Sequence, residues 1–251
     1  MSTRDSRLPD FILNFENIII QKTVKKPEAR WVNVFSEEFL GKNIQQLYAT
    51  ETLFGNWDGE LLILAQDALP ASSLKSVINS HTSKGESRAN AWRHADKIQY
   101  GDRAGWKTNQ RIKDFLKLYA PSIQGVYGSA TAHMLYDDGS ESYSQDLRGY
   151  KSKELQIHLI KVLKWVIDNM PNLKIILCLG SKAWDLAADA SGSKLTKDYQ
   201  NLRDTSNYKN VRISDKLLTI IPAYHPAARV DIKALEKNWR CLESLITKKT
   251  G

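Results

Sequence analysis

The 251-residue sequence contains little cysteine and no long apolar run. Its two cysteines, Cys178 and Cys241, are too few to hold an iron–sulfur cluster or a structural zinc ion by themselves, and we expect both to be buried thiols. No segment approaches the roughly 18 apolar residues of a membrane span. Residues 1–10 (MSTRDSRLPD) lack the apolar core of a signal peptide. These absences predict an intracellular, cytoplasmic protein with no membrane partner.

The sequence also lacks several familiar catalytic signatures. It has no phosphate-binding P-loop, no GxGxxG after a strand, no HExxH and no GxSxG. Its five histidines and two cysteines show no metal-ligand spacing, so we expect no metal site. We expect His81 and His94 to lie in loops and His158 to lie on the surface of a helix.

The charge of the chain is unbalanced although its composition is otherwise ordinary. Lys and Arg number 36 against 28 Asp and Glu, which gives a formal net charge of +8 and a pI near 9.3. A surplus of this size predicts a polyanionic partner, either nucleic acid or an anionic membrane surface. A generally basic, solvated surface is the alternative.

Apolar runs of strand length alternate with amphipathic helical patterns. Strands are predicted at 61–66, within 124–135, at 174–179 and at 217–221, and helices at 35–48, 107–119, 154–169, 180–188 and 231–246. Residues 71–105 and 137–152 are predicted as loops. The inward faces are predicted to be Ile112, Phe115, Leu116 and Tyr119 in one helix, and Ile157, Ile160, Leu163 and Ile167 in another. The alternation indicates an α/β fold with a parallel sheet covered on both faces, in one domain spanning residues 1–251.

Polar side chains follow the predicted strands where each strand ends. Asp67 follows the first strand (LLILAQDALP) and His225 follows the last (LLTIIPAYHPAARV). Ligands of open parallel sheets bind outside these carboxyl ends. Gly180 and Ser181 open a helix there, with Ser181 as its N-cap, and a helix amino terminus is a natural phosphate site. A carboxylate, an imidazole and a phosphate site suit hydrolysis of a bond near a nucleotide phosphate. The alternative is that Asp67 caps a helix and His225 satisfies a turn.

The same segments resemble the motifs of the uracil-DNA glycosylase superfamily. LLILAQDALP is similar to its first motif, VYGSATAHML to its pocket strand, IILCLGSKAW to its strand before a glycine-started helix, and IPAYHPAARV to its closing motif. The four motifs occur in the family's order within residues 54–240, and the motif-bearing part of the domain is about 54–246.

The resemblance implies a three-layer sandwich with a central four-stranded parallel sheet flanked by helices. It also implies a monofunctional DNA glycosylase that needs no cofactor and hydrolyses the N-glycosidic bond of uracil, or of a related deaminated base, in DNA. Such an enzyme flips the base out of the stack, which costs a few kcal/mol. The implied partner is uracil-containing DNA, and a monomer is the expected state.

The resemblance also assigns roles to individual residues. Asp67 orients or activates the attacking water, and His225 donates a hydrogen bond to the uracil carbonyl oxygen as the departing base becomes anionic. The residues that line the base pocket are Gln66, Ala68, Ser129 and Ala130, with Tyr100 or Trp106 stacking on the base. The helix amino termini at Ser181 and after Pro226 hold DNA phosphates, and Ala227 contacts DNA. Arg229 enters the minor groove or contacts a phosphate.

Three positions depart from the family pattern. Ala65 replaces a glycine, Ala68 stands where a proline or aromatic residue is common, and Ala130 stands where an asparagine usually reads uracil. A nearby hydroxyl or His133 then discriminates the base, or specificity is relaxed, or the chain binds without cutting. Two alternatives follow: a non-catalytic or product-retaining uracil- or abasic-DNA-binding protein on the same fold, and an unrelated α/β hydrolase or nucleotide-binding enzyme.

Overall fold

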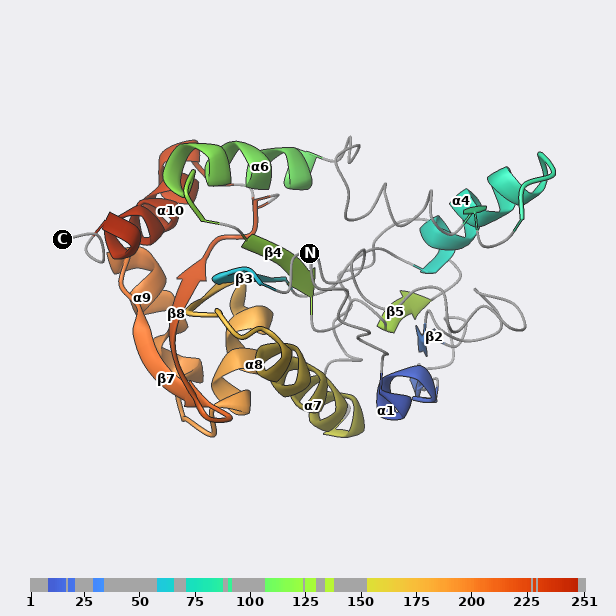
Figure 1. The fold of residues 1–251 in the computed structure, drawn as a ribbon, viewed down its shortest axis with the longest axis horizontal. Helices are drawn as coiled ribbons and strands as arrows, with labels where there is room; N and C mark the ends of the chain where they lie inside the picture. The colour runs from blue at the N-terminus through green and yellow to red at the C-terminus, as the bar shows by residue number, and fades with distance from the viewer. Residues whose placement is uncertain are drawn as a thin grey trace. The chain divides into compact units, whose positions relative to one another are not determined.

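The computed structural model describes residues 9–16, 18–20, 29–33, 58–65, 71–87, 90–91, 107–123, 125–129, 134–137, 153–226, 228 and 230–247 (Figure 1). The chain divides into two compact units. The antiparallel unit comprises residues 1–53, 67–103 and 131–158, and the parallel unit comprises residues 54–66, 104–130 and 159–251.

The parallel unit contains a five-stranded sheet in the order β4-β3-β6-β8-β7. Its strands are β3 (Leu61–Ala65), β4 (Gly125–Ser129), β6 (Ile175–Leu179), β7 (Lys209–Ile213) and β8 (Lys216–Ala223). Strands β4, β3, β6 and β8 are parallel to their neighbours, and β7 pairs antiparallel with β8 at the edge. The four predicted parallel strands are therefore confirmed, and β7 is an addition that the sequence pattern did not predict.

The edge position of β7 explains why its sequence carries a weak strand signal. Only Val211 and Ile213 are buried, whereas Arg212 is exposed between them. By contrast, all five residues of β3 and of β6 are buried, as expected of central parallel strands. Charged residues on an edge strand also discourage pairing with another chain.

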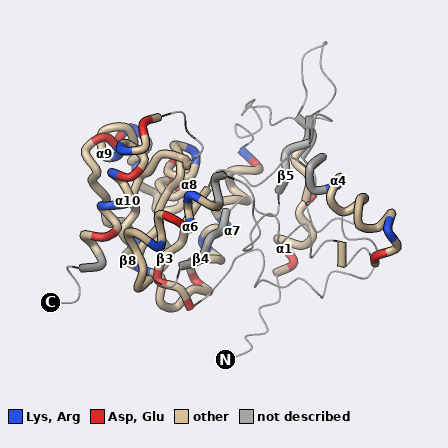
Figure 2. The backbone as a smooth tube through the Cα atoms, turned by 90° about the horizontal axis from the view of Figure 1, so that it is seen from above, with Lys and Arg blue, Asp and Glu red and all other residues tan. Residues whose placement is uncertain are grey.

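Helices cover both faces of this sheet. Helices α6 (Lys107–Tyr119) and α10 (Ile232–Thr247) pack on one face, where Phe115 and Trp239 join Ile63, Leu177 and Ile221 in one core cluster. Successive strand residues point to opposite faces, so Cys178 faces the other side, where α8 (Ser181–Ala190) packs on β6. Helix α7 (Lys153–Asn169) runs beside α8 in Figures 1 and 2. The result is a mixed α/β arrangement with helices on both sides of a mostly parallel sheet.

Two short helical segments lead from α8 to β7. The 3₁₀ helix η2 (Thr196–Asp198) runs directly into α9 (Tyr199–Thr205), which packs against β8. The cysteines of the unit, Cys178 and Cys241, are buried as predicted, and burial raises the pKa of the Cys178 thiol.

The predicted helices of the parallel unit are confirmed, with one error in an inward face. Ile112, Phe115 and Tyr119 are buried in α6, as predicted. In α7, Ile157 is 58% exposed, and the buried stripe includes Leu155 and Leu159. The helix carries apolar residues on more than one side. Residues two apart point about 200° apart, so placing Leu155 inward turns Ile157 outward.

The antiparallel unit contains a three-stranded sheet in the order β1-β2-β5. Its elements are α1 (Asp10–Leu13), β1 (Ile18–Ile20), β2 (Ala29–Asn33), α4 (Ala71–Thr82) and β5 (Met134–Asp137). The buried Asn33 ties β2 to α1 and to the segment after it, because its Nδ2 donates to the carbonyl oxygens of Ile12 at 2.9 Å and Phe15 at 3.0 Å. The predicted strand region 124–135 is thus divided between the two sheets.

Three predictions in this unit were wrong. Residues 71–82 form helix α4 rather than loop. The sequence there is polar, and the Thr82 hydroxyl donates back to a backbone carbonyl in a way that usually favours turns. His81 accordingly lies in α4, where its Nδ1 is 2.8 Å from Glu86 Oε1. His158 is buried rather than on the surface, because its ring stacks on Phe15 with centroids 3.4 Å apart. The predicted helix at 35–48 and residues 138–152 of the predicted loop lie outside the described residues.

Among the described residues, none of the helices combines the length and the apolar character that crossing a membrane requires. In the same residues, no group of three or more His, Cys, Asp or Glu side chains is arranged to hold a metal ion.

Candidate functional site

The carboxyl ends of the parallel strands are level with one another. Ala65 at the end of β3 pairs with Leu179 at the end of β6, and Leu179 pairs with Ala223 at the end of β8. Since β6 separates β3 from β8, Ala65 and Ala223 lie two strand spacings apart, roughly 10 Å. Asp67 follows Ala65 by two residues, and His225 follows Ala223 by two residues. Strands β3 and β8 therefore end at the same side of the sheet, each two residues before a predicted catalytic residue.

The described residues include only part of the predicted site. The side chains of His225 and Ser181 are described, and Ser129 is described as the last residue of β4. The other predicted site residues lie outside the described residues, and their roles stay predictions: Gln66, Asp67, Ala68, Tyr100, Trp106, Ala130, His133, Ala227 and Arg229.

His225 lies just beyond β8 and is partly buried. Its carbonyl oxygen accepts a hydrogen bond from the Ala228 amide at 2.8 Å, which closes a turn between β8 and α10. Burial lowers the pKa of the imidazole below its ordinary value. The ring is therefore neutral at pH 7, with one N–H to donate and one nitrogen to accept. Such a ring suits the role of a hydrogen-bond donor to a developing oxyanion.

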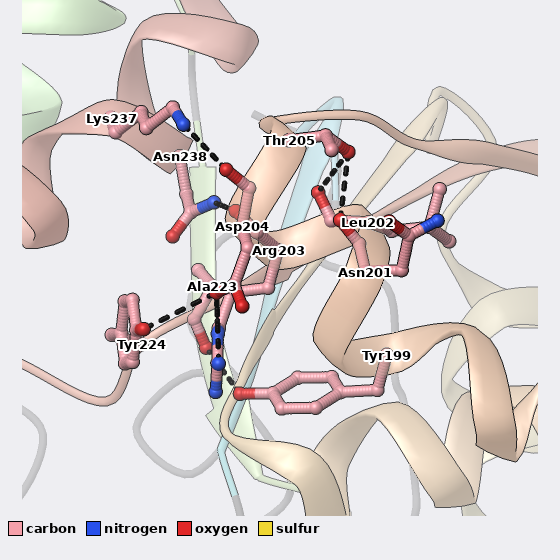
Figure 3. Close-up of polar contacts among 10 residues, drawn as sticks. All are labelled: Tyr199, Asn201, Leu202, Arg203, Asp204, Thr205, Ala223, Tyr224, Lys237 and Asn238. Atoms are coloured by element: carbon pink, nitrogen blue, oxygen red, sulfur yellow. Dashed lines mark hydrogen bonds and ion pairs between the residues drawn. The ribbon is translucent and has the colours of Figure 1, made fainter.

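The two residues before His225 are held by contacts that the sequence pattern did not predict. The carbonyl oxygen of Ala223 accepts hydrogen bonds from the Gly180 amide at 2.9 Å and from the Tyr199 hydroxyl at 3.1 Å. The Tyr224 ring lies against the guanidinium group of Arg203 (Figure 3). Tyr224 stands beside the histidine of the closing motif, but Arg203 lies in α9, a short polar helix with no motif.

The amino terminus of α8 differs from the prediction in its cap. Gly180, not Ser181, is the N-cap, and no side chain forms a capping hydrogen bond. Gly180 has a φ of 95°, a left-handed conformation that glycine adopts without strain. The first turn contains no acidic residue, and Ser181 is exposed. This helix end is therefore compatible with an anion, and the phosphate site at Ser181 stays a prediction.

The predicted helix after Pro226 is confirmed, and it begins one residue later than predicted. Helix α10 begins at Ile232, beyond the hydrogen bond from the Ala228 amide to the His225 carbonyl oxygen. Asp231 caps this helix, with its Oδ1 accepting from the Lys233 amide at 2.8 Å. A carboxylate already occupies this helix end and would repel a phosphate. Ala227 itself lies outside the described residues, and its DNA contact stays a prediction.

The lowered pKa of His225 predicts an acid-side loss of stability. As pH falls through about 6.5, the unfolded chain protonates this histidine more readily than the folded chain does. The stability present above this pH is therefore lost as pH falls toward the folded-state pKa. We expect the free energy of unfolding of the wild type to fall relative to that of His225→Gln between about pH 7.5 and about pH 5.5, measured by urea denaturation. Parallel curves for the two proteins would contradict a buried neutral imidazole.

Comparison with models of known protein families gives no match, and neither does comparison with curated proteins. The fold defines the class of this protein, which is a mixed α/β protein with a mostly parallel sheet and helices on both faces.

Proposed function

We propose that this chain is a DNA glycosylase that hydrolyses the N-glycosidic bond of uracil, or of a related deaminated base, in DNA. One observation carries the proposal: the carboxyl ends of β3 and β8 lie at the same height in the parallel sheet, and each precedes a proposed catalytic side chain by two residues. Because ligands of open parallel sheets bind outside the carboxyl ends of the strands, we propose that the base binds there, with the Asp67 carboxylate and the His225 imidazole as its catalytic partners.

In the proposed reaction the target base is flipped out of the DNA and bound between Asp67 and His225. The Asp67 carboxylate orients or activates a water molecule for attack on the sugar carbon and offsets its positive charge. The neutral imidazole of His225 donates a hydrogen bond to the base carbonyl oxygen. That bond strengthens as the departing base gains negative charge, so it stabilises the transition state more than the bound substrate.

The proposed DNA partner is supported by charge and by one helix end. The formal charge of +8 favours binding to a polyanion. In Figure 2 acidic residues accompany the basic ones along the described backbone, so orientation on DNA requires specific contacts in addition to net charge. Helix α8 begins directly after β6, at the same carboxyl-terminal side of the sheet as His225. A DNA phosphate bound there would lie near the proposed base pocket.

The direct test uses the wild-type protein and an oligonucleotide with one uracil at a defined position. We expect alkali treatment after incubation to break the strand at the uracil, because excision leaves an alkali-labile abasic site. The same oligonucleotide with thymine at that position is the control. An intact uracil strand, in both single- and double-stranded form, would contradict the proposed activity.

One sequence feature favours a second candidate. Ala130 stands where the resembled family places the base-reading asparagine. A protein that binds uracil or abasic DNA without turnover would produce a tight gel shift and no strand breakage in the same assay.

A substitution at Ser181, in the first turn of α8, is expected to change DNA affinity without lowering the stability of the protein. We expect Ser181→Asp to weaken DNA binding roughly tenfold, because the new carboxylate competes with a phosphate for the amide groups of α8. An acidic residue in the first turn of a helix also favours the helix dipole, so the variant is expected to be no less stable. Fluorescence anisotropy with labelled DNA measures the affinity, and Ser181→Asn is the uncharged control. Equal affinities for the two variants would exclude a phosphate at this helix end.

A further inference from the structure

Two arginines from different helices hold the residues on either side of His225. Arg203 of α9 contacts Tyr224, which precedes the histidine, and Arg111 of α6 contacts Pro226, which follows it. All of these residues belong to the parallel unit.

On the preceding side, Arg203 lies between two tyrosines. Its guanidinium carbon is 4.1 Å from the centroid of the Tyr224 ring and 5.2 Å from that of Tyr199 (Figure 3). The Arg203 side chain is only 16% exposed, so these cation–π contacts are partly shielded from water. Asp204 completes the arrangement, because its Oδ1 is 2.8 Å from Arg203 Nη2 and accepts from the Tyr224 hydroxyl at 3.3 Å. The Arg203 guanidinium lowers the pKa of the Asp204 carboxyl, which keeps the pair charged.

The backbone that carries Arg203 is itself fixed to α10. Asn238, which is fully buried, donates from Nδ2 to the Arg203 carbonyl oxygen at 2.7 Å. Lys237 donates from Nζ to the Asp204 carbonyl oxygen at 2.5 Å. The Arg203 carbonyl also accepts from the Ser206 amide at 3.2 Å, and the two bonds from α10 add side-chain partners to carbonyl groups at the end of α9. The backbone from which the Arg203 side chain extends toward Tyr224 is therefore held in place by α10.

On the following side, Arg111 donates from Nη1 to the carbonyl oxygen of Pro226 at 2.5 Å. Pro226 is buried, and proline has a restricted backbone. Arg111 is in the turn of α6 that includes the buried Ile112, so its backbone is attached to the core of the unit. The residues before and after His225 are thus restrained from α9 and from α6.

We infer that Arg203 and Arg111 are positioning residues that hold the Tyr224–Pro226 segment and thereby orient the His225 imidazole. The catalytic part of this inference rests on the proposed glycosylase function, whereas the restraint itself does not. A hydrogen-bond donor stabilises a developing oxyanion only when it is aimed at the place where the charge appears. A displacement of about 1 Å can cost on the order of 10²-fold in rate, so a restraint on both sides has a direct catalytic consequence.

Hydrogen exchange followed by mass spectrometry tests the restraint without any assumption about function. We expect Arg203→Ala and Arg111→Ala each to speed exchange about tenfold in peptides covering residues 224–228, which include the Ala228 amide bonded to His225. Exchange in the buried strand β6 is expected to stay unchanged. Arg212→Ala is the matched control, because Arg212 is an exposed arginine of the edge strand β7 in the same unit.

Milder variants keep the test decisive if an alanine variant unfolds. Arg203→Lys retains the charge and removes the planar group that lies on the tyrosine rings, so it is expected to speed local exchange as well. Tyr224→Phe retains the ring and removes only the 3.3 Å contact with Asp204, so it is expected to stay close to the wild type. The restraint would be overturned if Arg203→Lys, and every alanine variant that folds, exchanged at the wild-type rate in peptides covering residues 224–228.

Kinetics on the uracil oligonucleotide separate the restraint from the proposed function. For an active wild type, the arginine variants are expected to lower kcat about tenfold or more with little change in KM, because orientation acts on the chemical step. Faster local exchange with unchanged kcat would overturn the positioning role. An inactive wild type whose variants still show faster local exchange would contradict the glycosylase proposal and leave the restraint supported.

Discussion

Asp67→Asn is expected to lower the rate of uracil excision by roughly 10²–10⁴-fold, the contribution typical of a positioned acid–base group. Asparagine has nearly the shape of aspartate but cannot accept a proton from water and carries no negative charge to offset a cationic sugar. Binding of the flipped base is expected to change much less than the rate. Single-turnover excision on excess enzyme, with affinity measured separately by anisotropy, distinguishes the two effects.

The controls for this variant come from the same chain. Asp215→Asn removes a carboxylate from the exposed turn between β7 and β8, which the site does not use, and is expected to retain the wild-type rate. His225→Gln is expected to lower the rate by on the order of 10²–10³-fold, as for loss of one donor to a developing oxyanion. An Asp67→Asn rate within a few-fold of the wild type would remove the carboxylate from the mechanism.

The second large effect is on stability. Trp239→Ala is expected to lower the free energy of unfolding by about 3–5 kcal/mol, the range found when a large buried aromatic side chain is truncated. The Trp239 side chain is fully buried, and its ring centroid lies 5.2 Å from that of Phe115, where α10 and α6 meet over the sheet. Urea denaturation followed by circular dichroism measures the change as a lower midpoint at a constant slope.

Two further variants make the stability test specific. Leu118→Ala removes a side chain of α6 that is 60% exposed and is expected to change stability by no more than about 0.5 kcal/mol. Trp239→Phe retains the apolar contact with Phe115. It removes an indole Nε1 that is buried without a hydrogen-bond partner, so its cost is expected to be well below that of alanine. A loss below about 1 kcal/mol for Trp239→Ala would contradict the packing described here.

Predictions succeeded where one local pattern matched one environment. Helix α6 was predicted with its observed bounds, because all of its apolar residues except Leu118 form one stripe that packs in the core. Strands β3 and β6 were predicted from short runs that are apolar throughout, the pattern typical of a strand buried on both faces. In α7 the apolar residues surround much of the helix, so several inward faces fit the sequence and Ile157 was assigned to the wrong side.

Predictions failed where a residue's environment comes from a distant segment. The sequence around His158 is that of an ordinary helix, and its burial is due to Phe15, which is far away along the chain. The same holds within the candidate site. Arg203 precedes the closing motif in the chain by about twenty residues, so nothing in the sequence indicated its contact with Tyr224. This contact forms only when α9 packs against β8.

The amino-acid sequence by itself determined the alternation of strands and helices, the burial of both thiols and the position of His225 just beyond a strand. Each of these follows from short-range apolar periodicity and from residue type. Only the tertiary structure decided the level register of the strand ends, the edge strand β7, the cap at Gly180 and the arginines on either side of His225. These depend on hydrogen bonds and packing between segments far apart in the chain, and no local pattern encodes which distant partner supplies them.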